Sequence, residues 1–356
     1  MKTWELVFAA LVVVLNLQLH VHGAPQVPCY FIFGDSLADN GNNNLLQTKA
    51  KVNYLPYGID FPNGPTGRFT NGLTMFDMIA QLLGFDKPIP PFATANDADI
   101  LQGVNYASGA AGIRQETGKH LGDCISMDVQ LKNHWVIVSR IIKKLGNKYS
   151  AIKYLNKCLY SVGVGNNDYI NNYFSPKNYN TSHQYTPEQY SRVLIRHYSR
   201  QIENLYHNGA RKFALFGAGA VGCTPNSIAL YDRKGKPCVE EINTAVTLFN
   251  QQLISLVDNL NRNLSGAKVI YVNSYQMGTG DPSVLGFKVA NVGCCPVDQY
   301  GQCAPSKTPC RNRTEYVFWD SFHPTEASNR VTASRSYKAA LPNDTYPTDI
   351  SHLVQL

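Results

Sequence analysis

Two short stretches, one near each end of the chain, carry the residue types of a nucleophilic triad. Ser36 comes shortly after the apolar run Tyr30-Phe31-Ile32-Phe33, so it lies where a strand would end. Asp320 and His323 stand three positions apart near the other end of the chain. A serine hydroxyl becomes a good nucleophile when a histidine takes its proton and a carboxylate holds that histidine. The three residues therefore predict acyl transfer, with ester hydrolysis as the leading interpretation.

His323 has a neighbour that places it on a loop. Pro324 disfavours a helical conformation at the residue before it, and it favours a helix that begins at Thr325. An imidazole on such a loop, with Asp320 close behind it, can act as a general base near neutral pH. His134 and His197 lie on helical patterns instead, where a structural histidine is the better interpretation.

Ser36 by itself has a second interpretation, because Asp35 or Ser36 could simply cap a helix. The histidine and aspartate near the end of the chain favour the nucleophile.

Two further strand ends offer donors for the oxyanion that acyl transfer creates. Gly109 closes the block Asn105-Tyr106-Ala107-Ser108-Gly109, and its backbone N–H can approach a ligand without hindrance from a side chain. Asn167 offers a side-chain amide, although Gly165-Asn166-Asn167-Asp168 would also make a tight turn in any protein. With the Ser36 N–H, these residues give a predicted oxyanion hole of three donors.

The elements that must position these residues alternate along the chain. Each strand-like run ends in Gly, Ser or Asn, and helical patterns separate most of the runs. The strands are expected at 29–33, 103–107, 158–164, 212–216 and 268–272, and the helices at 74–83, 128–145, 188–206 and 238–264. This alternation predicts an α/β fold with a parallel sheet covered on both faces, and ligands then bind beyond the carboxyl ends of its strands.

Four blocks, in order, resemble those of the plant GDSL esterase/lipases, a family of the SGNH hydrolase superfamily. They are Phe33-Gly34-Asp35-Ser36-Leu37, the block that ends in Gly109, Gly165-Asn166-Asn167-Asp168 and Asp320-Ser321-Phe322-His323-Pro324. The resemblance runs from Cys29 to Leu356 and includes 39–43 and 221–225. It implies a flavodoxin-like three-layer α/β/α sandwich and a carboxylic ester hydrolase that acts on lipid or small acyl esters.

The same resemblance implies a role for each site residue. Ser36 would be the nucleophile, Asp320 and His323 would complete the triad, and Gly109 and Asn167 would donate to the oxyanion. No metal or organic cofactor is expected. One departure is Ala110, which stands where many relatives carry a second glycine and adds a methyl group beside the predicted oxyanion site.

A competing motif is Gly217-Ala218-Gly219-Ala220-Val221-Gly222, which fits the glycine pattern of dinucleotide-binding loops. Such a loop must open a helix whose N-terminus holds the pyrophosphate. Cys223-Thr224-Pro225 follows instead, and we expect an uninterrupted loop from there to Cys238. The sequence therefore disfavours a nucleotide site.

The first residues have the pattern of a secretory signal. Lys2 precedes the apolar stretch 6–15, and cleavage after Gly23 would leave residues 24–356 as a single domain. No later segment is apolar over the ~20 residues that a membrane span needs. We therefore expect a secreted, extracellular protein with no integral membrane segment.

The nine cysteines suit an oxidising compartment, and their odd number leaves at least one unpaired within the chain. Zinc is an alternative for Cys294, Cys295, Cys303 and Cys310, but the segment has no CxxC pair, so disulfides are favoured. Cys223 and Cys238 could close another loop, whereas Cys29 and Cys158 lie on strand patterns and are expected to be buried thiols. Glycosylation acceptors at Asn180, Asn263, Asn312 and Asn343 agree with secretion.

Charge excludes one class of partner. A net charge of +7 over 356 residues is mild, and it is not gathered into the basic face that nucleic acid binding needs. The expected partner is a small-molecule or lipid ester, and the sequence does not indicate an oligomeric state.

Two other functions remain open. An alcohol could capture the same acyl-enzyme, which would make the protein an acyltransferase, or the chain could be a non-catalytic secreted binding protein on a hydrolase scaffold. The aromatic loops 54–69 and 169–190 are expected either to line the cleft or to pack.

Overall fold

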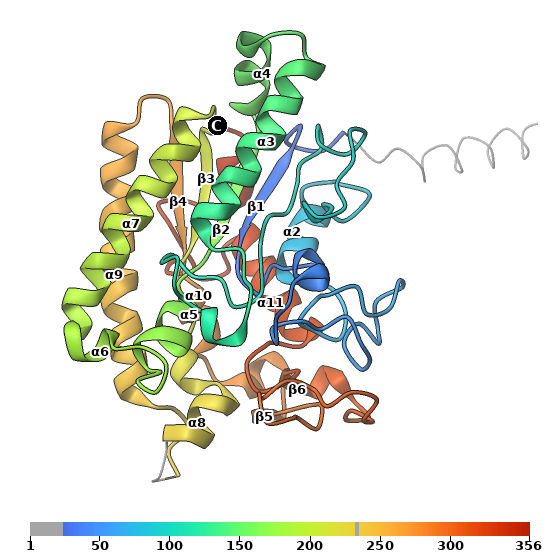
Figure 1. Ribbon diagram of the computed structural model, residues 1–356, viewed down its shortest axis with the longest axis vertical. Helices are drawn as coiled ribbons and strands as arrows, with labels where there is room; N and C mark the ends of the chain where they lie inside the picture. The colour runs from blue at the N-terminus through green and yellow to red at the C-terminus, as the bar shows by residue number, and fades with distance from the viewer. Residues whose placement is uncertain (1–23, 232–234) are drawn as a thin grey trace, which may run out of the picture.

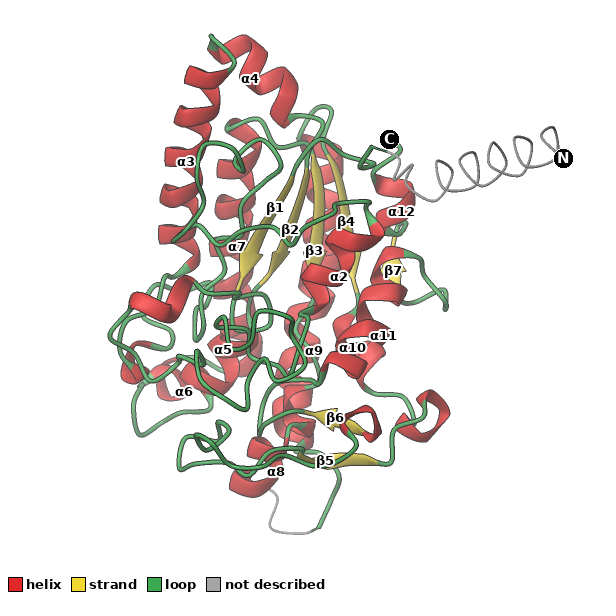
Figure 2. Ribbon diagram, turned by 90° about the vertical axis from the view of Figure 1, so that its right-hand side faces the viewer, coloured by secondary structure: helices red, strands yellow, loops and turns green. Residues whose placement is uncertain are grey.

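A five-stranded sheet forms the centre of the molecule. The computed structural model describes residues 24–231 and 235–356, so the predicted signal segment 1–23 lies outside the described residues. The strands are ordered β1-β2-β3-β4-β7, and the first four run parallel (Figures 1 and 2). Their bounds are Tyr30–Gly34 for β1, Leu159–Gly163 for β2, Lys212–Phe216 for β3, Lys268–Val272 for β4 and Thr345–Tyr346 for β7.

Apolar residues point to both faces of this sheet, because successive side chains of a strand alternate in direction. Along β1, Phe31 and Phe33 belong to one buried cluster, while Tyr30 and Ile32 belong to another. A sheet with two apolar faces must be covered twice, which produces the three layers seen in Figure 2.

Helices cover the sheet in two groups. One face packs against α3 (Met127–Lys144), α4 (Lys148–Leu155), α7 (Pro187–His207) and α9 (Glu240–Asn263). The other face packs against α2 (Met75–Leu82), α11 (Glu326–Tyr337) and α12 (Ile350–Leu353). All four helices expected from the sequence are present, with ends within two residues of the expected ones, and the predicted three-layer α/β/α fold is confirmed.

Polar caps fix where the helices begin. Thr186 caps α7 and accepts a hydrogen bond from the Gln189 N–H, and the Gln189 side chain bonds back to the Thr186 N–H. Thr74 and Asp77 form the same reciprocal pair at α2. Thr325 caps α11 directly after the predicted site loop. The helix therefore begins where Pro324 led us to expect it.

The fold differs from the sequence expectation in the expected strand 103–107, which is not a regular strand. It runs parallel to β1 and bonds to it, with a bridge between Ile32 and Asn105, but the Asn105 side chain binds the Ala38 carbonyl and the Ala107 N–H. It therefore still brings its carboxyl end to the same edge as β1. The short strand β7, which was not expected, joins the other edge of the sheet antiparallel to β4.

Shorter elements gather around the carboxyl ends of the parallel strands. They are α5 (Asn166–Asp168), α6 (Thr181–Gln184), α8 (Pro225–Tyr231), α10 (Ser274–Gly278) and a small two-stranded sheet of β5 (Val289–Gly293) and β6 (Tyr316–Phe318). No helix within the described ranges is long and apolar enough to cross a membrane.

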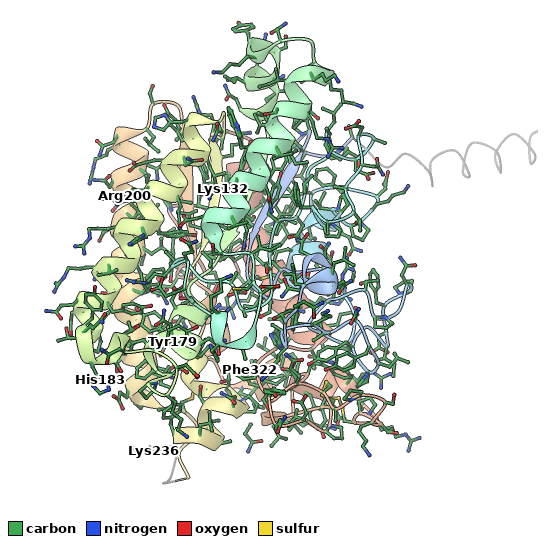
Figure 3. The ribbon with its side chains drawn as sticks, viewed as in Figure 1. Lys132, Tyr179, His183, Arg200, Lys236 and Phe322 are labelled. Atoms are coloured by element: carbon green, nitrogen blue, oxygen red, sulfur yellow. A yellow bond between two sulfur atoms is a disulfide. The ribbon has the colours of Figure 1, made fainter. Side chains whose placement is uncertain are left out.

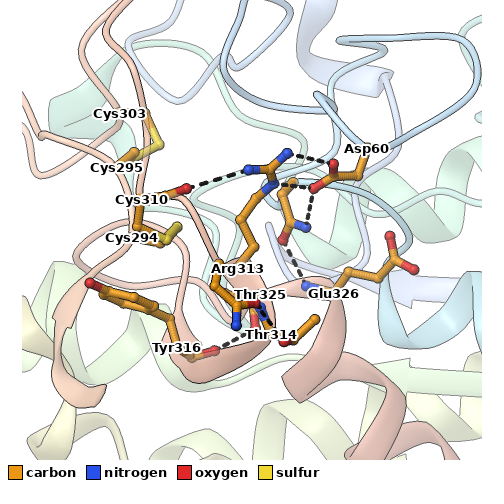
Figure 4. The surroundings of a disulfide bond; sticks show 12 residues. Asp60, Cys294, Cys295, Cys303, Cys310, Arg313, Thr314, Tyr316, Thr325 and Glu326 are labelled. Atoms are coloured by element: carbon orange, nitrogen blue, oxygen red, sulfur yellow. Dashed lines mark hydrogen bonds and ion pairs between the residues drawn. A yellow bond between two sulfur atoms is a disulfide. The ribbon is translucent and has the colours of Figure 1, made fainter. Parts of the chain in front are cut away.

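Four disulfides cross-link the chain. Cys294 pairs with Cys310 and Cys295 with Cys303 (Figure 4), and Cys223 pairs with Cys238, so the disulfides predicted for these six residues are confirmed. The expectation of buried thiols at Cys29 and Cys158 is wrong, because these two residues form the fourth disulfide. They precede β1 and β2, and the pairing of Tyr30 with Leu159 brings the two sulfurs together. Cys124 is a buried free thiol.

Candidate active site

The serine, histidine and aspartate singled out in the sequence form one hydrogen-bonded chain. His323 Nε2 lies 2.8 Å from Ser36 Oγ, and His323 Nδ1 lies 2.7 Å from Asp320 Oδ2. The Asp320 side chain is fully buried, and that of His323 is 9 % exposed. A neutral imidazole with Nδ1–H toward the carboxylate presents Nε2 as an acceptor for the serine proton.

The end of β1 holds Ser36 in place. The Gln130 amide of α3 bonds to both the N–H and the carbonyl of Gly34, at 3.0 and 2.8 Å. A Cβ on Gly34 would lie only 2.7 Å from the Gly163 carbonyl oxygen of the neighbouring strand, so only glycine fits there. No helix starts at Asp35 or Ser36; Asp35 Oδ1 accepts the Leu37 N–H inside a turn. The helix-cap interpretation of Ser36 is therefore wrong.

Backbone groups of its own loop orient Asp320. Its Oδ1 accepts the N–H groups of Phe322 and His323, both at 2.8 Å. The loop closes where the Trp319 N–H donates to the His323 carbonyl at 2.7 Å, and the Thr325 hydroxyl bonds to the Tyr316 carbonyl (Figure 4). The three-residue spacing of Asp320 and His323 thus produces a turn in which the carboxylate faces the imidazole.

The expectation that the Gly109 N–H is free for a ligand is wrong. This N–H donates to Asp39 Oδ2 at 2.9 Å, and the Gly109 carbonyl accepts from Asn43 Nδ2 at 3.1 Å. A Cβ at this position would also lie 2.7 Å from the Phe69 ring. The glycine is therefore needed for close packing and is already bonded.

The backbone N–H of the next residue, Ala110, differs from that of Gly109, which is already bonded. In a trans peptide the C=O and N–H point in opposite directions, so the bond from Asn43 to the Gly109 carbonyl turns the Ala110 N–H away from Asn43. This N–H has no acceptor among the residues that the structure describes. Ala110 lines the same cavity as Ser36 and His323, and its φ of 66° is a left-handed conformation that favours glycine.

Asn167 reaches the cavity from α5, beyond the end of β2. Its Nδ2 donates to the Ala111 carbonyl at 3.0 Å, which leaves one N–H of the amide, and its Oδ1 accepts from Asn171. The neighbouring Asp168 accepts the N–H groups of Ile113 and Arg114, and burial raises its pKa to about 6. These bonds join α5 to the segment that carries Ala110.

Two other buried carboxyl groups adjoin the site. Burial raises the pKa of Asp35, which precedes the serine, to about 6. It does the same for Asp39, although the N–H groups of Gly41, Gly109 and Asn42 oppose the effect by bonding to its carboxylate.

A cavity of about 1130 Å³ opens at this edge of the sheet. Its lining is largely apolar, and Ser36, His323 and Asn167 supply polar groups to its wall. The aromatic and aliphatic side chains that line it include Phe69, Ile170, Phe174, Leu285, Phe318 and Phe322, the last of which is labelled in Figure 3. Loops 54–69 and 169–190 do contribute, but not through their tyrosines. Tyr57, Tyr169 and Tyr190 are fully buried in packing.

The glycine motif 217–222 is already occupied by protein groups. The Ala218, Gly219 and Gly222 N–H groups donate to asparagine side chains, and the Gly217 N–H donates to the Val272 carbonyl. The expectation of an uninterrupted loop to Cys238 is wrong, because α8 begins at Pro225. Proline is tolerated in a first turn, and the Thr224 hydroxyl accepts the Ser227 N–H there. These four N–H groups are thus not available to cradle a phosphate.

Sequence reasoning assigned no role to three residues of this site: Asp39, Asn43 and Ala110. The first two belong to Asp39-Asn40-Gly41-Asn42-Asn43, whose density of short polar residues directly after the serine turn was the available signal. Short polar side chains favour bonds to nearby backbone, and here that backbone is the segment 107–109 from elsewhere in the chain.

Comparison with known proteins gives the family. A family model described as GDSL-like Lipase/Acylhydrolase matches residues 30–336. From Arabidopsis thaliana, GDSL esterase/lipase At1g29660 is 52% identical and covers 100% of this chain and 99% of its own length. GDSL esterase/lipase At5g45670 is 54% identical over 93% of both chains. Among solved structures, phospholipase A1 from Streptomyces albidoflavus NA297 matches over 85% of this chain and 94% of its own, at 14% identity and a TM-score of 0.33. The resemblance noted in the sequence is confirmed, and the chain belongs to the GDSL-like lipase/acylhydrolase family of carboxylic ester hydrolases.

Proposed function

We propose that the protein cleaves carboxylic esters through an acyl-enzyme on Ser36. The observation that carries the proposal is the hydrogen-bonded chain from Ser36 Oγ through His323 to the buried Asp320, at 2.8 and 2.7 Å, at the wall of a large apolar cavity. Each of the three groups is in a position to perform its part in nucleophilic catalysis.

In the first step, Ser36 Oγ attacks the carbonyl carbon while His323 Nε2 takes the hydroxyl proton. The carbonyl π electrons move to oxygen, and the Asp320 carboxylate stabilises the imidazolium. The oxyanion rests on the N–H groups of Ser36 and Ala110 and on the free N–H of the Asn167 amide. Ala110 replaces Gly109 in this role because the Gly109 N–H is bonded to Asp39.

In the second step, His323 gives its proton to the departing alkoxide, and the alcohol leaves. A water molecule then loses a proton to His323 and attacks the acyl carbon. The tetrahedral intermediate collapses, and Ser36 Oγ departs with the proton returned by His323. The products are a carboxylic acid and an alcohol, with the enzyme restored.

The shape of the cavity favours esters with an apolar acyl or alcohol part. Phe69, Ile170 and Phe174 lie on its wall with Ser36, and burial of apolar surface contributes ~25 cal/mol per Å². Lipid or aliphatic acyl esters are therefore the proposed substrate class.

Replacement of the serine tests the reaction. Ser36→Ala is expected to abolish cleavage of p-nitrophenyl esters and covalent labelling by a fluorophosphonate, because no other group takes the place of the nucleophile. Ser139→Ala, a change at an exposed serine on α3, is the matched control and should keep both. Labelling mapped to a residue other than Ser36, or unchanged ester cleavage by pure Ser36→Ala protein, would support a non-catalytic role for this site. A series of esters of rising chain length then defines the acyl preference.

The acyltransferase alternative rests on the same acyl-enzyme. Product analysis with and without an added alcohol separates the two activities, since a transferase yields a new ester and a hydrolase a free acid.

The proposal also covers the secretion of the protein and the bounds of its mature chain. Four disulfides support an oxidising compartment, and the acceptors Asn180, Asn263, Asn312 and Asn343 are all exposed. We propose cleavage after Gly23, secretion, and a single hydrolase domain over residues 24–356.

A further inference from the structure

Tyr57 contacts the triad although no part of the mechanism uses it. Its side chain is fully buried, and its hydroxyl donates to Asp320 Oδ2 at 2.6 Å. The same hydroxyl accepts the Cys303 N–H at 3.0 Å. Tyr57 therefore lies between the triad carboxylate and the loop closed by the Cys295–Cys303 disulfide.

The carboxylate of Asp320 receives four hydrogen bonds. Two backbone N–H groups bind Oδ1, while Tyr57 and His323 share Oδ2. A carboxylate offers about four lone-pair sites, so this set is complete. The phenol thus removes part of the negative charge from the oxygen that faces the imidazole.

The surroundings ensure that Tyr57 donates and does not ionise. Burial, and then the charge of Asp320, raise the pKa of Tyr57 well above its usual value. Its ring packs edge-on against Tyr54 and Phe69, and Phe69 in turn lies 4.8 Å from the His323 ring, centre to centre. Two other titratable groups interact with the triad through their charges. Asp35 interacts with His323, and Tyr54 interacts with Asp320.

We infer that Tyr57 is a positioning residue that fixes the orientation of Asp320 and limits the negative charge which Asp320 presents to His323. This inference rests on the proposed function. The phenol acts through Asp320 and touches neither the substrate nor the reacting atoms. The Cys303 N–H, in the segment closed by the Cys295–Cys303 disulfide, donates to the phenol and fixes its position.

A matched pair of variants tests the inference. Tyr57→Phe removes the hydroxyl that binds both Cys303 and Asp320. Tyr54→Phe removes a neighbouring hydroxyl that binds the Cys303 carbonyl at 3.1 Å and does not bond to Asp320. Both variants lose one bond to Cys303, so a difference between them reports the bond to Asp320.

The readout is kcat/KM against pH, together with the rate of fluorophosphonate labelling of Ser36. In Tyr57→Phe the acidic limb of both profiles should move to higher pH by about half a unit or more, since the bare carboxylate holds the imidazolium more strongly. The plateau should fall roughly 10-fold as Asp320 loses one of its orienting bonds, with KM little changed. In Tyr54→Phe the limb should stay where it is in the unchanged protein.

Several results would overturn the inference. An acidic limb that does not move in Tyr57→Phe, or moves equally in both variants, would leave Tyr57 with a packing role only. A far-ultraviolet spectrum and melting curve establish that each variant is folded. If the unchanged protein labels at no serine, the proposed function fails; if it labels at Ser36 and Tyr57→Phe labels with the same rate and pH dependence, only this inference fails.

Discussion

At the scale of single residues, the site depends on the neighbours Gly109 and Ala110, whose backbones have opposite needs. Gly109 has an ordinary backbone conformation, but a Cβ there would meet the Phe69 ring at 2.7 Å and Asn43 Nδ2 at 2.8 Å. Ala110 has room for its methyl group but sits at a φ of 66°, which strains an L residue by ~1–2 kcal/mol. The residue without a side chain, Gly109, thus does not occupy the left-handed position, and Ala110, which has a side chain, does.

Substitutions at these two positions should change the stability of the protein in opposite directions. Ala110→Gly should raise the free energy of unfolding by about 0.5–1 kcal/mol, because relief of the strain outweighs the added backbone freedom of glycine. Esterase activity should be retained, since the N–H remains. Urea unfolding with the disulfides intact measures the change. Gly109→Ala is the counterpart and should destabilise the protein; a stable Gly109→Ala variant would contradict the packing argument.

A second residue-level prediction concerns the oxyanion. Asn167→Ala should lower kcat by ~10²- to 10³-fold with a much smaller change in KM, because the donor acts on charge that exists only in the transition state. Steady-state kinetics on one p-nitrophenyl ester measures both constants. An equal loss in binding and turnover would instead indicate that Asn167 positions the ground-state substrate.

At the scale of elements, parallel pairing of β1 with β2 explains the disulfide that sequence reasoning missed. Tyr30 pairs with Leu159, so the residues just before them, Cys29 and Cys158, must also be neighbours. Nothing in either strand's own sequence says which strand is its partner. The same pairing carries Gly34 beside Gly163 and so brings Ser36 to the edge where Asn167 follows β2.

The lengths of the closed loops give a prediction for these disulfides. Cys29 and Cys158 are 129 residues apart, and Cys223 and Cys238 are 15 apart. In the chain-entropy account, the longer loop restricts the unfolded chain by ~5 kcal/mol and the shorter one by ~3 kcal/mol. The double change Cys29→Ala with Cys158→Ala should therefore cost about 2 kcal/mol more than Cys223→Ala with Cys238→Ala. Denaturant unfolding of both pairs measures this, and equal costs would contradict the entropic explanation.

At the scale of the whole molecule, ionisable groups buried between the layers have opposite effects on how stability depends on pH. Burial lowers the pKa of His134 to about 3, below the 6.5 of an exposed histidine, within a set of aromatic rings that includes Phe31 and Phe33. Its contribution to stability is present above pH 6.5 and is lost as pH falls toward 3. Asp35, Asp39 and Asp168, with pKa values raised to about 6, contribute in the opposite sense: their stabilisation is present below pH 3.8 and is lost as pH rises through 6.

Replacement of His134 isolates its contribution to the pH dependence of stability. Relative to the unchanged protein, His134→Phe should gain about 2–3 kcal/mol of stability as pH falls from 7 to 4.5, because the unfolded wild-type chain alone gains a proton there. Unfolding curves for both proteins at each pH give this difference, in which the carboxylate effects cancel. Parallel curves over that interval would show that His134 titrates alike in the folded and unfolded chains.

The sequence by itself determined the α/β class, the four long helices, four of the five predicted strands, six of the eight paired cysteines, and Ser36, Asp320 and His323 as the residues that could do chemistry. These features depend on local signals: apolar periodicity, helix caps, a proline after a histidine, and clustered cysteines. Only the tertiary structure decided which strands pair, that Cys29 meets Cys158, and that the Gly109 N–H donates to Asp39. Those outcomes depend on contacts between segments far apart in the sequence or on the direction of a single peptide plane, and no local pattern encodes either.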